Sequence, residues 1–194
     1  MAAMSEPGLH EIVLVRHGET EWSEAKKHTS NTDLALNERG RERARTLAPK
    51  LEGLEFALIL VSPLRRARET CELAGFADRA EVTDDLFEWR YGDDEGLTTE
   101  EIRQDRPGWT VWRDGPQGGE TAEQVCARVD SLIEQAANVA GDTLLFAHGH
   151  ILRALAARWI GLQVSGGAHL ILHTATVSRL GYERDTRAIL AWNT

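Results

Sequence analysis

Three apolar runs of strand length constrain the fold more than any other feature of this sequence. They cover residues 11–15, 56–61 and 143–147, and helical patterns stand between them. Alternation of buried strands with helices is typical of an α/β domain with a mostly parallel sheet. We therefore predict a three-layer α/β/α sandwich formed by residues 1–194 as a single domain, with residues 1–9 as a flexible N-terminus.

Capping residues and prolines predict where the helices begin and end. Ser62 and Pro63 follow an apolar run as N-cap and first helical residue, so we expect a helix from there to about residue 74. Pro49 should kink, or end early, the helix that begins near Asn37. Further helix starts are predicted at Thr98 and Thr121, with a later helix ending at Trp159. Additional short strands are expected at residues 80–83, 169–173, 176–182 and 187–193.

Composition narrows the class of protein. The net charge of −9 argues against nucleic-acid or membrane-surface binding, because both partners are polyanions. The two cysteines, Cys71 and Cys126, lack metal-ligand spacing and suit a reducing compartment. No leader-like or membrane-spanning segment is evident in the sequence. We therefore expect a cytoplasmic protein.

Polar and reactive residues stand directly after three of the predicted strands. These are Arg16-His17-Gly18, the Ser62–Arg66 segment and His148-Gly149-His150. In an open parallel sheet, ligands bind beyond the carboxyl ends of the strands, so these groups should converge on one pocket. Histidines, arginines and backbone N–H groups at helix starts together indicate a phosphate-binding site.

Six blocks in the same order resemble the histidine phosphatase superfamily, branch 1, which is phosphoglycerate mutase-like. They are LVRHGETEW (14–22), TDLALNERG (32–40), SPLRRARET (62–70), LFEWRYGDDEGLT (86–98), GGET (118–121) and FAHGH (146–150). Within this superfamily, the segments around residues 21–36 and 88–115 look most like sedoheptulose-bisphosphatase relatives and actinobacterial acid phosphatases. The resemblance implies the phosphoglycerate mutase-like α/β fold and a small sugar phosphatase.

The resemblance also implies roles for five residues. His17 matches the nucleophile that becomes a phosphohistidine, and Arg16 and Arg66 match the arginines that hold the phosphate. His148 matches the second histidine of the phosphate pocket, which we expect to be protonated, and Glu88 matches the proton donor to the leaving oxygen. For His17 to attack, its other ring nitrogen should donate to a backbone carbonyl or a carboxylate.

Substrate contacts are predicted less directly. Arg113, in the loop at residues 105–120, is a candidate for binding a second anionic part of the substrate, and Trp109 and Trp112 could cover the pocket. Arg65 is expected to face solvent. The full set of predicted substrate-binding residues is Ser23, Thr29, Ser30, Tyr91, Arg113, Gly149 and His150.

The resulting prediction is a phosphomonoesterase for a small phosphorylated metabolite, with no cofactor, no metal and the possibility of a homodimer. The alternatives are a 2,3-bisphosphoglycerate-dependent mutase and a non-catalytic module that binds a phosphorylated ligand. A zinc site of His17, His148 and His150 is disfavoured, because the neighbouring arginines would repel a cation. Asp94 and Glu95 are rival acids to Glu88.

Overall fold

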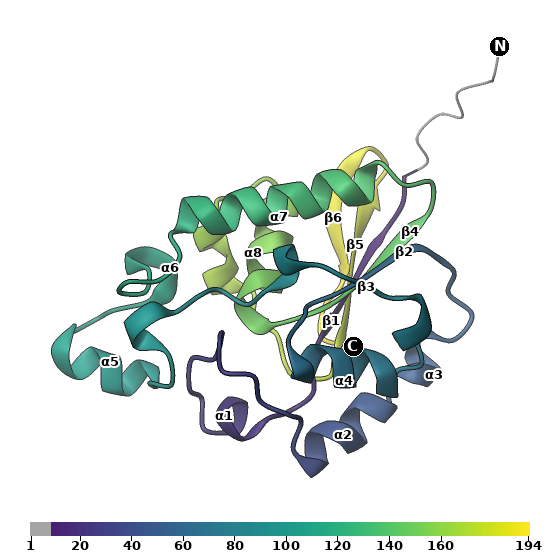
Figure 1. The fold of residues 1–194 in the computed structure, drawn as a ribbon. Helices are drawn as coiled ribbons and strands as arrows, with labels where there is room; N and C mark the ends of the chain where they lie inside the picture. The colour runs from purple at the N-terminus through teal and green to yellow at the C-terminus, as the bar shows by residue number, and fades with distance from the viewer. Residues whose placement is uncertain (1–8) are drawn as a thin grey trace.

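The computed structural model describes residues 9–194 and contains one six-stranded sheet in the order β3-β2-β4-β1-β5-β6 (Figure 1). Neighbours among β1 to β4 pair in parallel, whereas β5 is antiparallel to both β1 and β6. Five of the six strands therefore run in the same direction, which confirms the mostly parallel sheet. The strands are β1 (Ile12–Arg16), β2 (Phe56–Val61), β3 (Glu81–Val82), β4 (Asp142–Ala147), β5 (Val177–Glu183) and β6 (Thr186–Ala191).

Helices cover both faces of this sheet, with α7 and α8 on one side and α2 to α4 on the other (Figure 1). The α-helices are α1 (Glu21–Glu24), α2 (Glu38–Arg45), α3 (Ala48–Leu51), α4 (Arg65–Leu73), α5 (Thr99–Asp105), α6 (Val111–Asp114), α7 (Ala122–Ala137) and α8 (Gly149–Trp159). Short 3-10 helices cover Ala77–Arg79, Asp84–Leu86, Gly92–Asp94 and Val164–His169.

The apolar core consists of two clusters, one on each face of the sheet. Ile12 and Leu14 pack into the cluster with α7 and α8, whereas Val13 and Val15 pack into the cluster with α2 and α4. Successive side chains of a strand point to opposite faces, so a strand covered by helices on both sides is apolar at every position. This burial explains the continuous apolar runs in the sequence, and the three-layer sandwich is the observed arrangement.

Most predicted helix boundaries are confirmed. Asn37 caps α2 by accepting a hydrogen bond from the Gly40 N–H at 2.7 Å. Thr98 and Thr121 begin α5 and α7 with complete capping boxes. The helix is also interrupted before Pro49: α2 ends at Arg45, and a separate helix, α3, begins at Ala48.

The predicted start of a helix at Ser62 is wrong. Helix α4 begins at Arg65, and its N-cap residue Leu64 makes no side-chain cap. The Ser62 N–H instead donates to the Phe146 carbonyl at 3.0 Å, so the chain continues alongside β4 beyond the end of β2. The Ser62 hydroxyl pairs with His148 at 2.7 Å, which gives it a partner outside the helix.

The predicted strand at residues 169–173 is also wrong. This segment is irregular after the 3-10 helix ends at His169. The Ile171 carbonyl accepts hydrogen bonds from the side chains of Trp192 and Asn193 at 2.6 and 2.7 Å. The Ile171 carbonyl thus accepts hydrogen bonds from side chains, where in a strand it would accept one from the backbone of a neighbouring strand.

The N-terminus, the membrane-helix content and the cysteines compare with the sequence predictions as follows. Of the N-terminus predicted to be flexible, only Leu9 lies within the described residues. Across residues 9–194, no helix has both the length and the hydropathy that crossing a bilayer requires. Cys71 and Cys126 are free thiols, and burial raises the pKa of Cys71 to about 12, so this thiol is unreactive near neutral pH.

Candidate active site

A cavity of about 320 Å³ lies where β1 and α8 bring their polar residues together. Four of the five residues with predicted catalytic roles line it: Arg16, His17, Arg66 and Glu88. Of the predicted substrate-binding residues, the structure places Ser23, Thr29, Tyr91, Gly149 and His150 in its wall.

His17 is held with one ring nitrogen free. Its Nδ1 lies 2.7 Å from the Gly18 carbonyl oxygen, which can only accept, so Nδ1 carries the proton and donates. Burial, followed by the positive charges of Arg66 and Arg16, lowers the pKa of His17 well below its usual value. The imidazole is therefore neutral near pH 7, and the lone pair on Nε2 is available for nucleophilic attack.

The carbonyl that orients His17 is itself fixed by close backbone packing. Gly18 donates its N–H to Thr70 Oγ1 at 2.9 Å. A Cβ on Gly18 would lie 2.5 Å from the Gly40 carbonyl oxygen, and a Cβ on Gly40 would lie 2.1 Å from that of Glu19. Two glycines therefore allow the loop after β1 to rest directly on the first turn of α2.

Arg66 is buried in the wall of the cavity and anchored by three hydrogen bonds. Its Nε donates to His148 Nδ1, and its two terminal nitrogens donate to the carbonyls of Thr32 and Thr29, each at 3.1 Å. A guanidinium group has five N–H donors. One N–H on each terminal nitrogen of Arg66 is thus left for a ligand.

Arg16 lies across the N-terminus of α8 and has unused hydrogen-bonding capacity. One terminal nitrogen donates to the Leu172 carbonyl. A Cβ on Gly149 would lie 3.4 Å from the guanidinium carbon, so the glycine makes room for this side chain. The buried Nε of Arg16 has no hydrogen-bond partner among residues 9–194.

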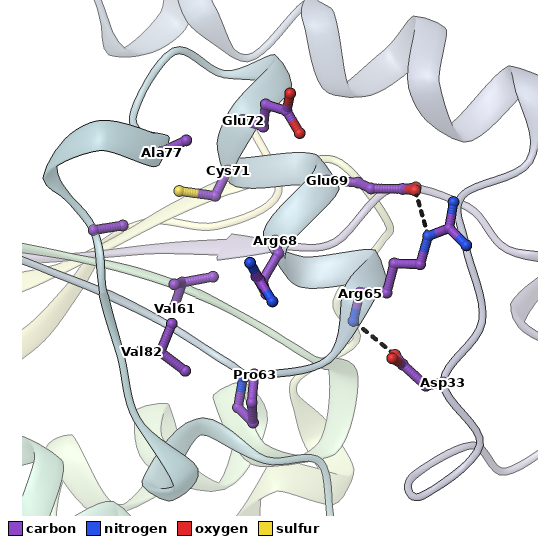
Figure 2. Close-up of a pocket in the computed structure, with 11 residues that line it drawn as sticks. Asp33, Val61, Pro63, Arg65, Arg68, Glu69, Cys71, Glu72, Ala77 and Val82 are labelled. Atoms are coloured by element: carbon purple, nitrogen blue, oxygen red, sulfur yellow. Dashed lines mark hydrogen bonds and ion pairs between the residues drawn. The ribbon is translucent and has the colours of Figure 1, made fainter.

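Arg65, the neighbour of Arg66, does not line the cavity of His17 and belongs to the wall of a different cavity of about 580 Å³ (Figure 2). Its backbone N–H donates to Asp33 and its Nε donates to Glu69, both at 2.7 Å. The side chain is exposed, as the sequence predicted. Adjacent arginines of one helix thus belong to the walls of two separate cavities.

The predicted protonation state of His148 is wrong. The ring is fully buried behind Arg66, accepts the Arg66 Nε–H at Nδ1, and so donates from Nε2 to Ser62 Oγ. Burial and the charge of Arg66 lower the pKa of His148 well below its usual value. His148 is therefore neutral, and it lies 5.1 Å from the His17 ring, centroid to centroid, rather than in the cavity wall.

Glu88 accepts three backbone hydrogen bonds at the start of α8. Oε1 accepts from Trp89 and Ile151 at 3.0 and 2.9 Å, and Oε2 accepts from His150 at 3.0 Å. These contacts fix the orientation of the carboxyl group at the cavity, because backbone donors cannot rotate away. Both oxygens of Glu88 are thus held in place by hydrogen bonds from backbone N–H groups.

The two rival acids are committed elsewhere. Asp94 is buried, pairs with Arg106 and accepts the Gln117 N–H. Glu95 accepts hydrogen bonds from the backbone of Ser30 and Thr32, each at 2.9 Å. Neither carboxylate lines the cavity that contains His17.

Tyr91 and His150 form a pair in the cavity wall, with the hydroxyl oxygen 2.6 Å from Nδ1. Burial and the nearby Glu88 raise the pKa of Tyr91 well above its usual value, so the hydroxyl keeps its proton. Burial and the charge of Arg153 lower the pKa of His150 well below its usual value. Tyr91 is therefore the donor and His150 Nε2 carries a proton.

Two predicted substrate-binding residues, Ser30 and Arg113, are not among the residues that line this cavity. The Ser30 hydroxyl bonds Glu95 at 2.5 Å and accepts the Tyr91 N–H, so it supports the wall from behind. Arg113 is exposed and bonds Asp114 and the Gly108 carbonyl.

The two tryptophans do not cover the pocket either. Neither lines the cavity; instead, Trp109 packs edge-on against His28 at 5.4 Å and Trp112 packs against His150 at 5.1 Å between ring centroids. They therefore support histidines of the cavity wall from outside it.

Several cavity residues were missed by sequence reasoning. Lys26, Lys27, His28 and Thr99 line the cavity from a turn after α1 and from α5. Arg153 also lines it, and its position four residues after Gly149 was a usable signal, since such residues share one helix face.

The histidines of the site do not form a metal centre. Within residues 9–194, no group of three or more His, Cys, Asp or Glu side chains is arranged to hold a metal ion. His148 offers no free nitrogen for a metal, because Arg66 and Ser62 occupy both ring positions.

Comparison with known proteins places this geometry in a family. The family model for the histidine phosphatase superfamily, branch 1, matches residues 12–194. An acid phosphatase of Mycobacterium tuberculosis is 39% identical over 184 residues, covering 93% of this chain and 90% of that protein. The sedoheptulose 1,7-bisphosphatase of Saccharomyces cerevisiae is 36% identical over 207 residues, covering 90% of this chain and 75% of that protein.

The fold of this chain also resembles that of solved structures. A structure of an open reading frame product from M. tuberculosis superposes with a TM-score of 0.92 at 37% sequence identity, covering 95% of this chain and 97% of that chain. Both the match of the family model over nearly the whole chain and the identity to named phosphatases support one conclusion. The chain belongs to the histidine phosphatase superfamily, branch 1, and is a phosphatase.

Proposed function

We propose that the protein hydrolyses a phosphorylated metabolite of small size, such as a sugar phosphate, through a phosphohistidine on His17 and without a metal ion. The observation that carries this proposal is the fixed tautomer of His17, which leaves Nε2 free beside two guanidinium groups. A neutral imidazole is a competent nucleophile near pH 7 without a separate base.

In the first step, His17 Nε2 attacks phosphorus and the bond from phosphorus to the ester oxygen breaks. Glu88 in its protonated form gives its proton to the departing oxygen, which leaves as an alcohol. In the second step, water attacks the phosphohistidine, Glu88 accepts a proton from that water, and the bond to Nε2 breaks to release phosphate. His17 and Glu88 return to their starting protonation states.

Arg16 and Arg66 supply the positive charge for both steps. Their free N–H groups can donate to phosphate oxygens as charge moves onto them in the transition state. Loss of one such prearranged donor typically lowers kcat by about 10²- to 10³-fold. His148 acts indirectly by holding the Arg66 Nε at 3.1 Å.

The test is phosphate release from p-nitrophenyl phosphate and from a sugar phosphate, each with and without EDTA. We expect activity that resists EDTA and is abolished in His17→Ala. Glu88→Gln should impair the sugar phosphate far more than the aryl ester, because nitrophenolate leaves without protonation. Activity retained in His17→Ala would refute the proposal.

The same preparation tests the two alternatives. Conversion of 3-phosphoglycerate that depends on added 2,3-bisphosphoglycerate would identify a mutase. Binding of phosphate without hydrolysis of any ester in a broad panel would identify a non-catalytic module.

A further inference from the structure

The guanidinium group of Arg16 is held by a single hydrogen bond. One terminal nitrogen donates to the Leu172 carbonyl, the buried Nε has no partner, and the group makes no other hydrogen bond to residues 9–194. In the proposed function this group binds the phosphate, so the direction of one carbonyl decides where its charge lies. A misplacement of about 1 Å can lower turnover about 10²-fold.

The segment that carries this carbonyl has little backbone support of its own. Residues 170–173 form neither helix nor strand, and Ile171 and Leu172 make no backbone–backbone hydrogen bond within the described chain. The Leu172 side chain is buried, which anchors the segment but leaves the adjoining peptide units free to rotate. The direction of the Leu172 carbonyl must therefore be set by side chains from elsewhere.

Asn193 supplies this orientation. Its Oδ1 accepts the His173 N–H at 2.8 Å, and its Nδ2 donates to the Ile171 carbonyl at 2.7 Å. The Leu172 carbonyl and the His173 N–H belong to one planar trans peptide unit, so they point in opposite directions. Asn193 thus holds one end of the same peptide plane whose other end accepts the hydrogen bond of Arg16.

Asn193 is itself fixed next to β5. Its φ is +60°, a left-handed conformation that asparagine adopts more readily than most other residues. Its N–H donates to Ser178 Oγ at 3.1 Å, and its Oδ1 also accepts the Thr176 hydroxyl at 3.1 Å. Thr194 pairs with Val177 in both directions, at 2.9 and 3.0 Å. The amide group of Asn193 therefore has a defined place from which to hold the 172–173 peptide.

Asn193 does not line the cavity that contains His17. Arg16 lines both that cavity and a second one of about 430 Å³, whereas Asn193 lines only the second. Any effect of Asn193 on phosphate must therefore pass through the 172–173 peptide and Arg16.

We propose that Asn193 is a positioning residue that, through the 172–173 peptide, holds the Arg16 guanidinium group where it binds phosphate. Hydrogen bonds in such a chain polarise one another, which makes the Leu172 carbonyl a stronger acceptor. This inference rests on the proposed function and deepens it, since it names a residue outside the cavity on which phosphate affinity depends.

The test compares Asn193→Gly with Thr194→Val. Glycine suits the left-handed backbone, so the first variant removes the amide with little backbone strain. The second removes one hydroxyl hydrogen bond to the Val177 carbonyl, at 3.0 Å, from a residue that lines neither cavity. For Asn193→Gly we expect about a tenfold rise in the Kd of inorganic phosphate, measured by calorimetry, and in KM for p-nitrophenyl phosphate. Thr194→Val should change both by less than twofold.

Coupling to Arg16 is a readout that a merely structural role would not affect. In an Arg16→Met background, Asn193→Gly should change kcat/KM for p-nitrophenyl phosphate by less than twofold, because no guanidinium group is left to position. An effect of Asn193→Gly that is equally large in both backgrounds would overturn the inference.

A conservative variant tests the hydrogen bond itself. Asn193→Asp keeps an acceptor for the His173 N–H, and the Ile171 carbonyl still accepts the Trp192 indole N–H at 2.6 Å. Asn193→Asp should therefore retain most of the phosphate affinity at about 0.15 M salt, which screens the added charge. Phosphate binding as weak as in Asn193→Gly would contradict the inference.

A second variant covers the case in which Asn193→Gly fails to fold. Thr176→Val removes the hydroxyl that donates to Asn193 Oδ1, so the Kd of phosphate should rise at least twofold; no rise would overturn the inference. The inference is also overturned if Asn193→Gly and Thr194→Val behave alike. Hydrolysis of p-nitrophenyl phosphate that depends on His17 would leave the proposed function intact in either case.

Discussion

Replacement of Arg66 by lysine keeps the charge but removes the geometry that the structure assigns to this side chain. Arg66 is 1% exposed, and its planar group reaches three acceptors, each at 3.1 Å: two carbonyls of the loop at residues 29–32 and the His148 ring before α8. An ammonium group is a single point and cannot span them. A lysine at this position should therefore lose at least two of the three hydrogen bonds that Arg66 makes.

The expected cost follows from these contacts. A hydrogen bond to a charged group contributes about 1.5 kcal/mol or more, so loss of two predicts about 3 kcal/mol of lost unfolding free energy. For a domain of this size, that corresponds to a fall in melting temperature of roughly 6–12 °C. Because the remaining N–H groups of Arg66 face a ligand, kcat/KM should also fall at least about 100-fold.

Arg65→Lys is the matched control one residue earlier on the same helix. The Arg65 side chain is 59% exposed and pairs only with Glu69 across one helical turn. Such an exposed pair contributes about 0.5 kcal/mol or less, so stability and activity should barely change. Thermal denaturation followed by tryptophan fluorescence and steady-state kinetics provide both readouts. Equal effects of the two variants would refute the reasoning.

Three further predictions concern other parts of the structure. Gly18→Ala should cost about 1–3 kcal/mol and lower kcat, because its Cβ meets a carbonyl oxygen at 2.5 Å; unchanged stability and kcat would contradict this. Arg113→Ala should change KM less than twofold for both mono- and bisphosphates, because this side chain is exposed and paired with Asp114. A rise in KM for bisphosphates alone would show that Arg113 binds the substrate. Stability should fall with pH below about 6.5 by up to about 1.4 kcal/mol per pH unit for each buried histidine whose pKa is lowered, since the unfolded chain binds the protons first. Urea denaturation between pH 7 and 5 checks this, and a flat profile would contradict the neutral states of His17, His148 and His150.

The sequence predicted those features that depend on local pattern. Apolar runs located β1, β2 and β4, and capping residues located the starts of α2, α5 and α7. The polar residues at the ends of β1 and β4 were expected to meet, because parallel strands end at the same edge of a sheet. These inferences need only short segments and a sheet topology.

Features that depend on long-range partners could not be predicted. Ser62 satisfies every local rule for an N-cap, yet its hydroxyl bonds His148, which is 86 residues away in the chain. The protonation state of His148 depends on which nitrogen faces Arg66. Arg113 appeared available until the structure paired it with its neighbour Asp114. In each case, a tertiary contact decided between two locally acceptable arrangements.

The position of the phosphoryl group on the imidazole tests the central claim most directly. Because Nδ1 of His17 donates to the Gly18 carbonyl at 2.7 Å, only Nε2 is free to attack phosphorus. Rapid quenching of a turnover reaction in alkali, followed by ³¹P NMR and peptide mass spectrometry, identifies both the residue and the ring nitrogen. The structure predicts phosphate on Nε2 of His17. Phosphate on Nδ1, on another residue, or on none during steady turnover would contradict it.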